Sequence, residues 1–125
     1  MAESIICERA FEFAVRVLKL CERLWARGPA ARHVASELLR SASSIGANAE
    51  EAQEAQSKAD YIAKMSISSK ETRETRWWLR LLIGTGLVKP EEITWEQDEA
   101  GQLGKMIRSA ILTARSSPAR GGGVR

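Results

Sequence analysis

The chain has 125 residues, of which 44% are hydrophobic and 28% are charged, and its formal net charge is +3 at pH 7. This length suits one domain with a single core, and the composition is ordinary for a soluble protein. No apolar run is long enough to span a membrane, and the start of the chain, Met1-Ala2-Glu3-Ser4, lacks the basic residues and apolar core of a signal peptide. The expected location is therefore the cytoplasm, and no membrane partner is expected.

The first predicted helix covers about residues 5–27. Apolar side chains recur along it at alternating spacings of four and three, which is typical of an amphipathic helix. The expected buried seam consists of Cys7, Phe11, Ala14, Leu18, Cys21 and Trp25, with Ala10, Val17 and Leu24 beside them. Because about 21 Å would separate the two cysteines along this helix, we expect two buried thiols rather than a disulfide. Gly28 is expected to stop the helix, and Pro29 suits a turn or the first position of the next helix.

The second predicted helix covers about residues 30–55, and its seam consists mostly of small residues. The seam is Ala35, Leu38, Ala42, Ile45, Ala49 and Ala52. Gly46 costs helix stability, about 1 kcal/mol relative to Ala. Its expected use is the close approach of a neighbouring helix.

The third predicted helix begins after Ser57, which with Asp60 three residues later can cap it, and it ends near Gly84. Its expected seam is Tyr61, Met65, Ser68, Thr72, Thr75, Leu79 and Leu82. The fourth helix is predicted to start with a capping box formed by Thr94 and Gln97. Its expected seam is Ala100, Leu103, Ile107, Ala110 and Ala114.

Four amphipathic helices with short connections predict an all-α protein, an antiparallel up-down four-helix bundle. We expect a single domain over residues 1–115. Residues 116–125, rich in Gly, Ser and Arg, are expected to form a disordered basic tail.

Polar side chains lie beside or within the seams of the second and third predicted helices. They are Arg40, Ser41, Ser44, Asn48, Glu51, Glu71 and Glu74. One interpretation is a hydrogen-bonded structural network between helices that fixes their register. The other is a polar cleft or a subunit contact. Either way partners are expected, because a buried polar group without one costs about 1–3 kcal/mol.

The sequence offers little for catalysis. The only histidine is His33, whereas metal-binding bundles use Glu-x-x-His pairs and a Ser–His–Asp triad needs a histidine beside its nucleophile. We therefore expect no catalytic residues, no metal and no cofactor.

The third predicted helix is the basic one. Residues 56–89 carry seven basic and three acidic side chains, whereas residues 30–55 carry two basic and four acidic ones. At about 100° per residue, Lys70, Arg73, Arg76 and Arg80 share the side opposite the seam, with Trp77 among them. Tryptophan and arginine together suit stacking on bases and binding of phosphates, but both are also enriched at protein interfaces. Nucleic-acid binding, a subunit interface and a solvated face therefore all stay open.

Two long motifs in the middle of the chain resemble a known family. They are Arg40-Ser41-Ala42-x-Ser44-Ile45-Gly46-Ala47-Asn48-x-x-Glu51-Ala52 and Lys70-Glu71-x-x-Glu74-Thr75-x-x-Trp78-Leu79-x-Leu81-Leu82, with Asp60-Tyr61-Ile62-x-Lys64-Met65-x-Ile67 before the second. They resemble the signatures of small bacterial four-helix-bundle proteins related to those encoded in intervening sequences of large-subunit ribosomal RNA genes. The resemblance covers about residues 5–112.

The resemblance implies a ring-like homopentamer with a central channel and no known enzymatic activity. The same fold is similar to the accessory variability protein of diversity-generating retroelements, which binds nucleic acid and a reverse transcriptase through basic surface. The leading hypothesis is thus a non-enzymatic, ring-forming protein that binds RNA, DNA or a protein partner, such as a reverse transcriptase, through its basic face. The alternative is a purely structural or protein-interaction module with no nucleic-acid partner.

Overall fold

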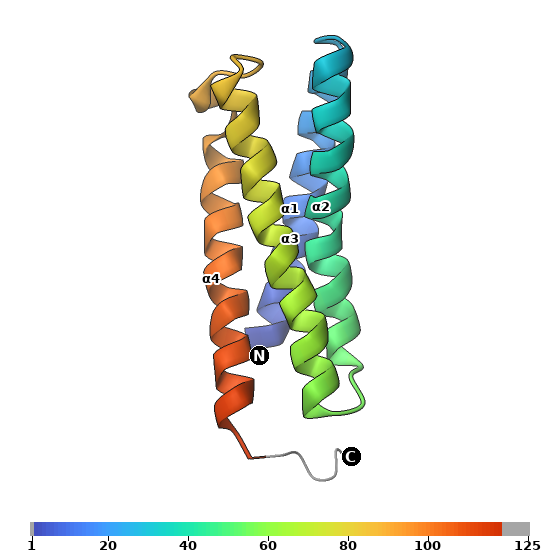
Figure 1. Ribbon diagram of the computed structural model, residues 1–125, viewed down its shortest axis with the longest axis vertical. Helices are drawn as coiled ribbons and strands as arrows, with labels where there is room; N and C mark the ends of the chain where they lie inside the picture. Colours follow the sequence, from blue (N-terminus) through green and yellow to red (C-terminus); the bar gives the residue numbers. More distant parts are fainter. Residues whose placement is uncertain (1, 119–125) are drawn as a thin grey trace.

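The computed structural model describes residues 2–118, with side chains from Ile5 onward, as four long helices in an up-down bundle (Figure 1). The helices are α1 (Ala2–Trp25), α2 (Pro29–Gln53), α3 (Lys58–Gly84) and α4 (Thr94–Ser116), and a short 3₁₀ helix, η1 (Pro90–Ile93), precedes α4. Helix α2 packs against α1 and α3, and α4 packs against α3 and α1, so the four form a closed square. The described residues contain no strand, and the predicted all-α four-helix bundle is confirmed.

Two connections form as their glycines and caps predict. Gly28 adopts a φ of 109°, which favours glycine, and Pro29 follows it at the start of α2. The side chain of Ser57 accepts a hydrogen bond of 3.0 Å from the backbone N–H of Asp60 and so caps α3. After α3, Gly86 turns the chain with a φ of 75°.

The prediction that Thr94 forms a capping box with Gln97 is wrong. The chain already turns at η1, where the Glu92 carboxylate accepts a 2.8 Å hydrogen bond from the backbone N–H of Lys89. The Thr94 hydroxyl donates to the Pro90 carbonyl instead of accepting from the start of the helix. Arg27 lies in the connection between α1 and α2, and its guanidinium binds the Glu92 carboxylate. This contact is the main reason that the pKa of the Glu92 carboxyl falls to about 2.

The predicted seam of α1 is confirmed at Cys7 and Cys21, and at the neighbouring Ala10, Val17 and Leu24, but it is wrong at three large side chains. Phe11, Leu18 and Trp25, which the spacing places inside, are 70%, 47% and 51% exposed. The side chains that α1 buries are Ile6, Cys7, Ala10, Phe13, Val17, Leu20, Cys21 and Leu24. Helix α1 is apolar over most of its circumference, so two rows of its sequence satisfy the helical spacing. The neighbouring helices decide which row is buried.

Gly46 of α2 lies where α1 crosses α2 closely, with Ala10 directly against it. A Cβ at position 46 would lie 3.3 Å from the Cβ of Ala10, closer than most real side-chain contacts. With Ala10 held against Gly46, Phe13 turns into the core and stacks on Trp95 of α4 with ring centroids 6.2 Å apart. The predicted close approach at Gly46 is thus present, and Ala10 is its neighbour.

The other three seams lie close to their predicted positions. Every predicted seam residue of α2 is buried, as are those of α3 except the half-buried Tyr61. In α4, Ala110 and Ala114 are only half-buried, and Ile111 is buried beside them.

Within the described residues no helix combines the length and the apolar character that crossing a bilayer requires. Helix α4 ends at Ser116, where the tail was predicted to begin. Residues 119–125 of that predicted tail lie outside the described residues.

Candidate functional site

Arg40 of α2 connects two carboxylates of the predicted polar set, and one carboxylate outside it, through its guanidinium. Its guanidinium contacts Glu74 of α3, lies 3.5 Å from Glu71 Oε1 and lies 3.4 Å from Glu37 on its own helix. Glu71 is buried, and its Oε1 has no hydrogen-bond partner, so Arg40 is the cation that balances it. The Trp78 indole N–H, which donates to Glu74 at 3.0 Å, and the Arg40 guanidinium together lower the pKa of Glu74.

Hydroxyl groups join α2 to α3 within the core. Thr75 Oγ1 donates to Ser41 Oγ at 2.9 Å, Ser41 Oγ donates to the Leu38 carbonyl, and Ser68 Oγ donates to the Ile45 carbonyl at 2.7 Å. All three hydroxyls are buried and paired. Their paired geometry fixes the register of the two helices.

The remaining polar residues of the set do not belong to this cluster. Asn48 donates to the Ser44 carbonyl one turn earlier on α2, at 2.8 Å. Glu51 lies 3.5 Å from Lys64 of α3 in an exposed ion pair. The seven residues therefore form separate contacts along the α2–α3 junction rather than one continuous network.

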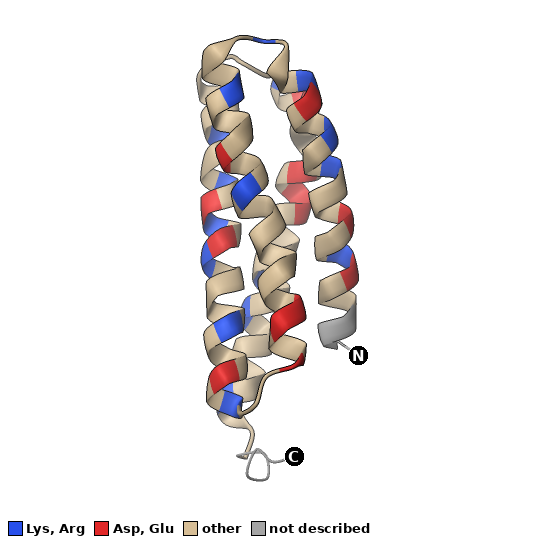
Figure 2. Ribbon diagram, turned by 90° about the vertical axis from the view of Figure 1, so that its right-hand side faces the viewer, with Lys and Arg blue, Asp and Glu red and all other residues tan. Residues whose placement is uncertain are grey.

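The predicted basic face of α3 consists of Lys70, Arg73, Arg76, Trp77 and Arg80, and all five are exposed. None of its four cations forms an ion pair with an acidic residue that the structure describes. Trp77 is 50% exposed and packs edge-on against Trp78, with ring centroids 4.9 Å apart. In Figure 2, which views the bundle from the side of α2, basic and acidic residues alternate along the helices. The basic face is therefore distinguished by unpaired charge around an exposed indole rather than by a surface of one sign.

A groove between α3 and α4 adds basic residues that the sequence analysis did not single out. Its lining, here called the α3/α4 groove, is Ser66, Ser69, Arg73, Arg108, Ile111, Leu112 and Arg115. Arg108 and Arg115 have no ion-pair partner among the described residues, and Leu112 is 63% exposed. The arginines of α4 stand 35 or more positions from Arg73 in the sequence, so only the predicted antiparallel packing of α3 on α4 could have suggested the groove.

A second surface feature is the apolar row of α1, which consists of Phe11, Val15, Leu18 and Trp25. These residues share one outward side of the helix, and each is at least 36% exposed. The Arg32 guanidinium lies 5.9 Å from the Trp25 ring. Contiguous exposed apolar residues mark interaction surfaces more often than scattered ones do.

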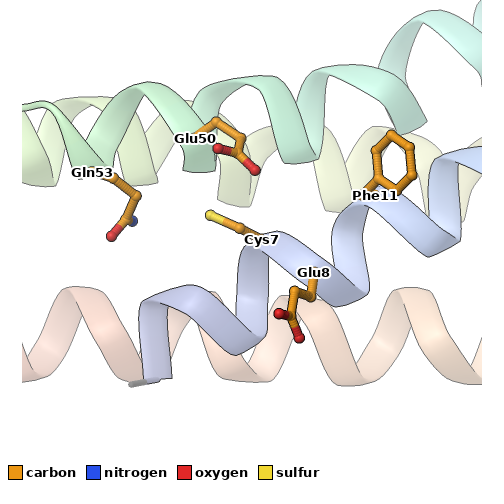
Figure 3. Close-up of a pocket in the computed structure, with 5 residues that line it drawn as sticks. All are labelled: Cys7, Glu8, Phe11, Glu50 and Gln53. Carbon is orange, nitrogen blue, oxygen red and sulfur yellow. The ribbon is translucent and has the colours of Figure 1, made fainter.

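The apolar row reaches a second groove, between α1 and α2, here called the α1/α2 groove. Cys7, Glu8, Phe11, Glu50 and Gln53 line it. Figure 3 shows the Cys7 thiol pointing toward α2, where Glu50 and Gln53 lie, and the Glu8 carboxylate pointing away from α2. No described basic residue pairs with Glu8 or Glu50, so this groove is acidic whereas the α3/α4 groove is basic.

Among the described residues, no group of three or more His, Cys, Asp and Glu side chains could hold a metal ion. Cys21 lies in the core, where its thiol donates to the Ala35 carbonyl and burial raises its pKa to about 11, so it is a poor nucleophile at neutral pH. The basic face and the two grooves present guanidinium, ammonium, carboxylate, amide, hydroxyl and apolar side chains.

Comparison with known proteins agrees with the fold. A family model described as 23S rRNA-intervening sequence protein matches residues 2–109. A crystal structure at 1.70 Å resolution superposes with a TM-score of 0.83 and 35% sequence identity, covering 90% of this chain and 99% of that chain. That protein, from Bacteroides thetaiotaomicron VPI-5482, is described as a member of the S23 ribosomal protein family with unknown function. No curated protein matches the chain.

Proposed function

This chain belongs to the 23S rRNA-intervening sequence protein family, and we propose that it is a non-enzymatic protein that forms a ring-like homo-oligomer, a pentamer, and binds RNA or DNA. The contact with nucleic acid is made by the basic face of α3. The same face also suits the binding of a protein partner, such as a reverse transcriptase, in place of nucleic acid. Two surface features together support the proposal: the exposed apolar row on α1, and the cations around Trp77 on α3 that form no ion pair with a described acid.

The apolar row supports the assembly. Phe11, Leu18 and Trp25 are each about half exposed or more. Exposing several large apolar side chains on one helix to water is unfavourable in free energy. A second copy of the bundle that covers the row would remove this cost. Interfaces of this kind are enriched in aromatic residues.

We expect light scattering coupled to size exclusion to give a mass of several copies, with five as the expected number. Phe11→Ser and Leu18→Ser together should lower that mass, because they remove the apolar contact from an already exposed surface. Arg23→Ser is the matched control, since its side chain is exposed on α1 and is turned about 120° or more from Phe11, Leu18 and Trp25. A monodisperse monomer of the natural chain at micromolar concentration would contradict the proposed ring.

The basic face supports the nucleic-acid contact. Arg73, Arg76 and Arg80 carry charges that no described acid neutralises, and Trp77 offers half of its surface beside them. Guanidinium groups bind phosphates, and an exposed indole can stack on an unpaired base. Single-stranded RNA or DNA therefore fits this face better than a fully stacked duplex.

Binding to mixed single-stranded RNA and DNA should weaken steeply as salt rises, because bound cations release counterions from the phosphates. Arg73, Arg76 and Arg80→Ala together should reduce the slope of log K against log salt by about 2. The matched control replaces Lys19, Arg23 and Lys89 by Ala, which removes equal charge outside the face. Fluorescence anisotropy measures both, and an absence of binding at low salt, or equal effects of the two variants, would remove the proposal.

The second candidate is a structural or protein-interaction module with no nucleic-acid partner. The edge-on packing of Trp77 against Trp78 favours it, because Trp78 is in turn held by Glu74 and forms a rigid base for a subunit contact. In that case Trp77→Ala changes the mass of the assembly, whereas charge reversal at Arg76 and Arg80 does not.

A further inference from the structure

The α3/α4 groove brings together three cations that no nearby acid neutralises. Arg73 of α3 and Arg108 and Arg115 of α4 line it, and none of them forms an ion pair with an acid in the described part of the chain. Residues three and four positions away are the closest neighbours on a helix surface, and none of those around these three arginines is acidic. The groove therefore carries positive charge that an anion from outside the chain can balance.

The groups that line the groove are held in place before any ligand binds. Arg73 Nη1 donates to Ser69 Oγ at 3.4 Å. The Ser69 hydroxyl is itself buried, and no described group accepts its proton, so it can donate to an anion. Gly104 leaves room for the Arg108 guanidinium, because a Cβ at position 104 would lie 3.2 Å from Arg108 Nη1. Groups that are already ordered lose less entropy when a ligand binds.

The groove has the chemistry of a site for a phosphate at the end of a strand. Guanidinium groups bind phosphate oxygens in pairs. A terminal phosphate carries close to two charges near neutral pH and three strong acceptor oxygens, whereas a phosphate inside a strand carries one charge. The groove has a volume of about 300 Å³, at the small end for ligand pockets. Ile111 and Leu112 add an apolar strip on which the attached nucleoside can pack.

The groove is continuous with the basic face of α3. At about 100° per residue, Ser66, Ser69, Arg73, Trp77 and Arg80 lie within about 80° of one another around this helix. Arg73 belongs both to the groove and to the basic face. Trp77 stands four positions later, about 6 Å further along α3. A strand that begins in the groove can therefore bring a base over the exposed indole.

We propose that the α3/α4 groove holds the terminal phosphate of a single-stranded RNA or DNA, and that the strand continues along α3 over Trp77. This inference rests on the proposed nucleic-acid binding and names the part of the strand that is recognised. An acidic protein segment fits the groove less well, because a carboxylate brings one charge and two oxygens to three guanidinium groups.

Three forms of one single-stranded RNA test the site: one with a 5′-phosphate, one with a 3′-phosphate and one with hydroxyls at both ends, each with a dye on an internal base. By fluorescence anisotropy, one phosphorylated form should bind the natural chain about tenfold more tightly than the hydroxyl form, the effect of one charge-assisted contact.

This preference should shrink below about pH 6, where a terminal phosphate takes up its second proton. The charged residues that line the groove from α3 and α4 are the three arginines, and their closest charged neighbours on the two helices are Lys70, Arg76 and Lys105. All of these stay protonated between pH 5 and 8, so the change in preference reports the ligand.

Arg108→Gln with Arg115→Gln changes two exposed residues and should remove the preference for the phosphorylated form. The matched control is Arg23→Gln with Lys89→Gln, which removes equal charge from exposed positions and should keep the preference. In Figure 1 the end of α1 and the connection after α3, which carry the control positions, lie at the upper end, whereas the groove segments of α3 and α4 lie in the lower half. Circular dichroism checks folding, and if the groove variant is unfolded, Arg115→Gln alone decides.

The outcomes separate this site from the proposed function. A natural chain that binds none of the three RNAs at low salt overturns the nucleic-acid binding itself. Equal binding of the three, or a preference that the groove variant keeps, overturns only the terminal-phosphate site. Adenosine monophosphate that competes as tightly as the phosphorylated RNA would assign the groove to a free nucleotide, and oligo-glutamate that does so would assign it to an acidic protein. Either result overturns the proposal.

Discussion

Phe13→Ala is expected to lower the free energy of unfolding by about 3–5 kcal/mol, because Phe13 is fully buried and its loss leaves a cavity beside Trp95. Phe11→Ala, two positions away on the same helix, should change the free energy of unfolding by no more than about 0.5 kcal/mol. Urea unfolding followed by circular dichroism measures both at a protein concentration low enough to dissociate any assembly.

The pair of substitutions is a direct test of how α1 is rotated. The helical spacing of the sequence favours Phe11 as a core residue, whereas the structure exposes 70% of it. Equal losses for the two variants, or a larger loss for Phe11→Ala in the dissociated protein, would contradict the packing of Ala10 against Gly46. Phe11→Ala should show its effect instead on the mass of the assembly.

Arg40→Ala is expected to cost about 1–3 kcal/mol of unfolding free energy at neutral pH, because it leaves the buried Glu71 carboxylate without its cation. Lys64→Ala is the matched control. It removes the cation of the exposed pair with Glu51 and should cost less than about 1 kcal/mol. Thermal unfolding or urea titration compares the two, and equal losses would contradict the structural role of Arg40.

The loss of unfolding free energy caused by Arg40→Ala should depend on pH. In the folded protein Trp78 and Arg40 lower the pKa of Glu74, so the ionised carboxylate is favoured by folding. Its contribution is fully present above the unfolded pKa, about 4.3, and is lost as the pH falls through the lower folded value. The difference between the natural chain and Arg40→Ala should therefore be largest near neutrality and shrink below about pH 4. Glu71→Gln in the Arg40→Ala background should recover part of the loss at neutral pH.

For the polar residues along the α2–α3 junction, the sequence predicted some of the contacts between helices and not others. Arg40, Glu71 and Glu74 were expected to have partners, and the structure brings these three together. Asn48 was grouped with them, yet it bonds to its own helix at Ser44. A polar side chain near a seam can reach its own backbone or the next helix, and the helical spacing is the same in both cases.

Local chemistry determined much of this protein. The seam of α2 has one apolar row of small residues, so its buried side was determined before any partner was known. The cap at Ser57 and the turn at Gly28 likewise depend on one residue and its immediate neighbours. The sequence also placed the basic face on the outer side of α3, because its charges and its seam lie on opposite sides of one helix.

Only the tertiary structure decided which of two apolar rows α1 buries, how the chain turns before α4 and where the grooves lie. Two rows of α1 satisfy the helical spacing. The buried row is the one that contains Ala10, which packs closely against Gly46 of α2. The turn before α4 is held by Glu92, which binds both Arg27 and the Lys89 N–H, instead of by the predicted capping box, and Arg27 is 65 positions away from Glu92 in the sequence. The grooves combine residues of separate helices, and a periodic pattern describes one helix at a time.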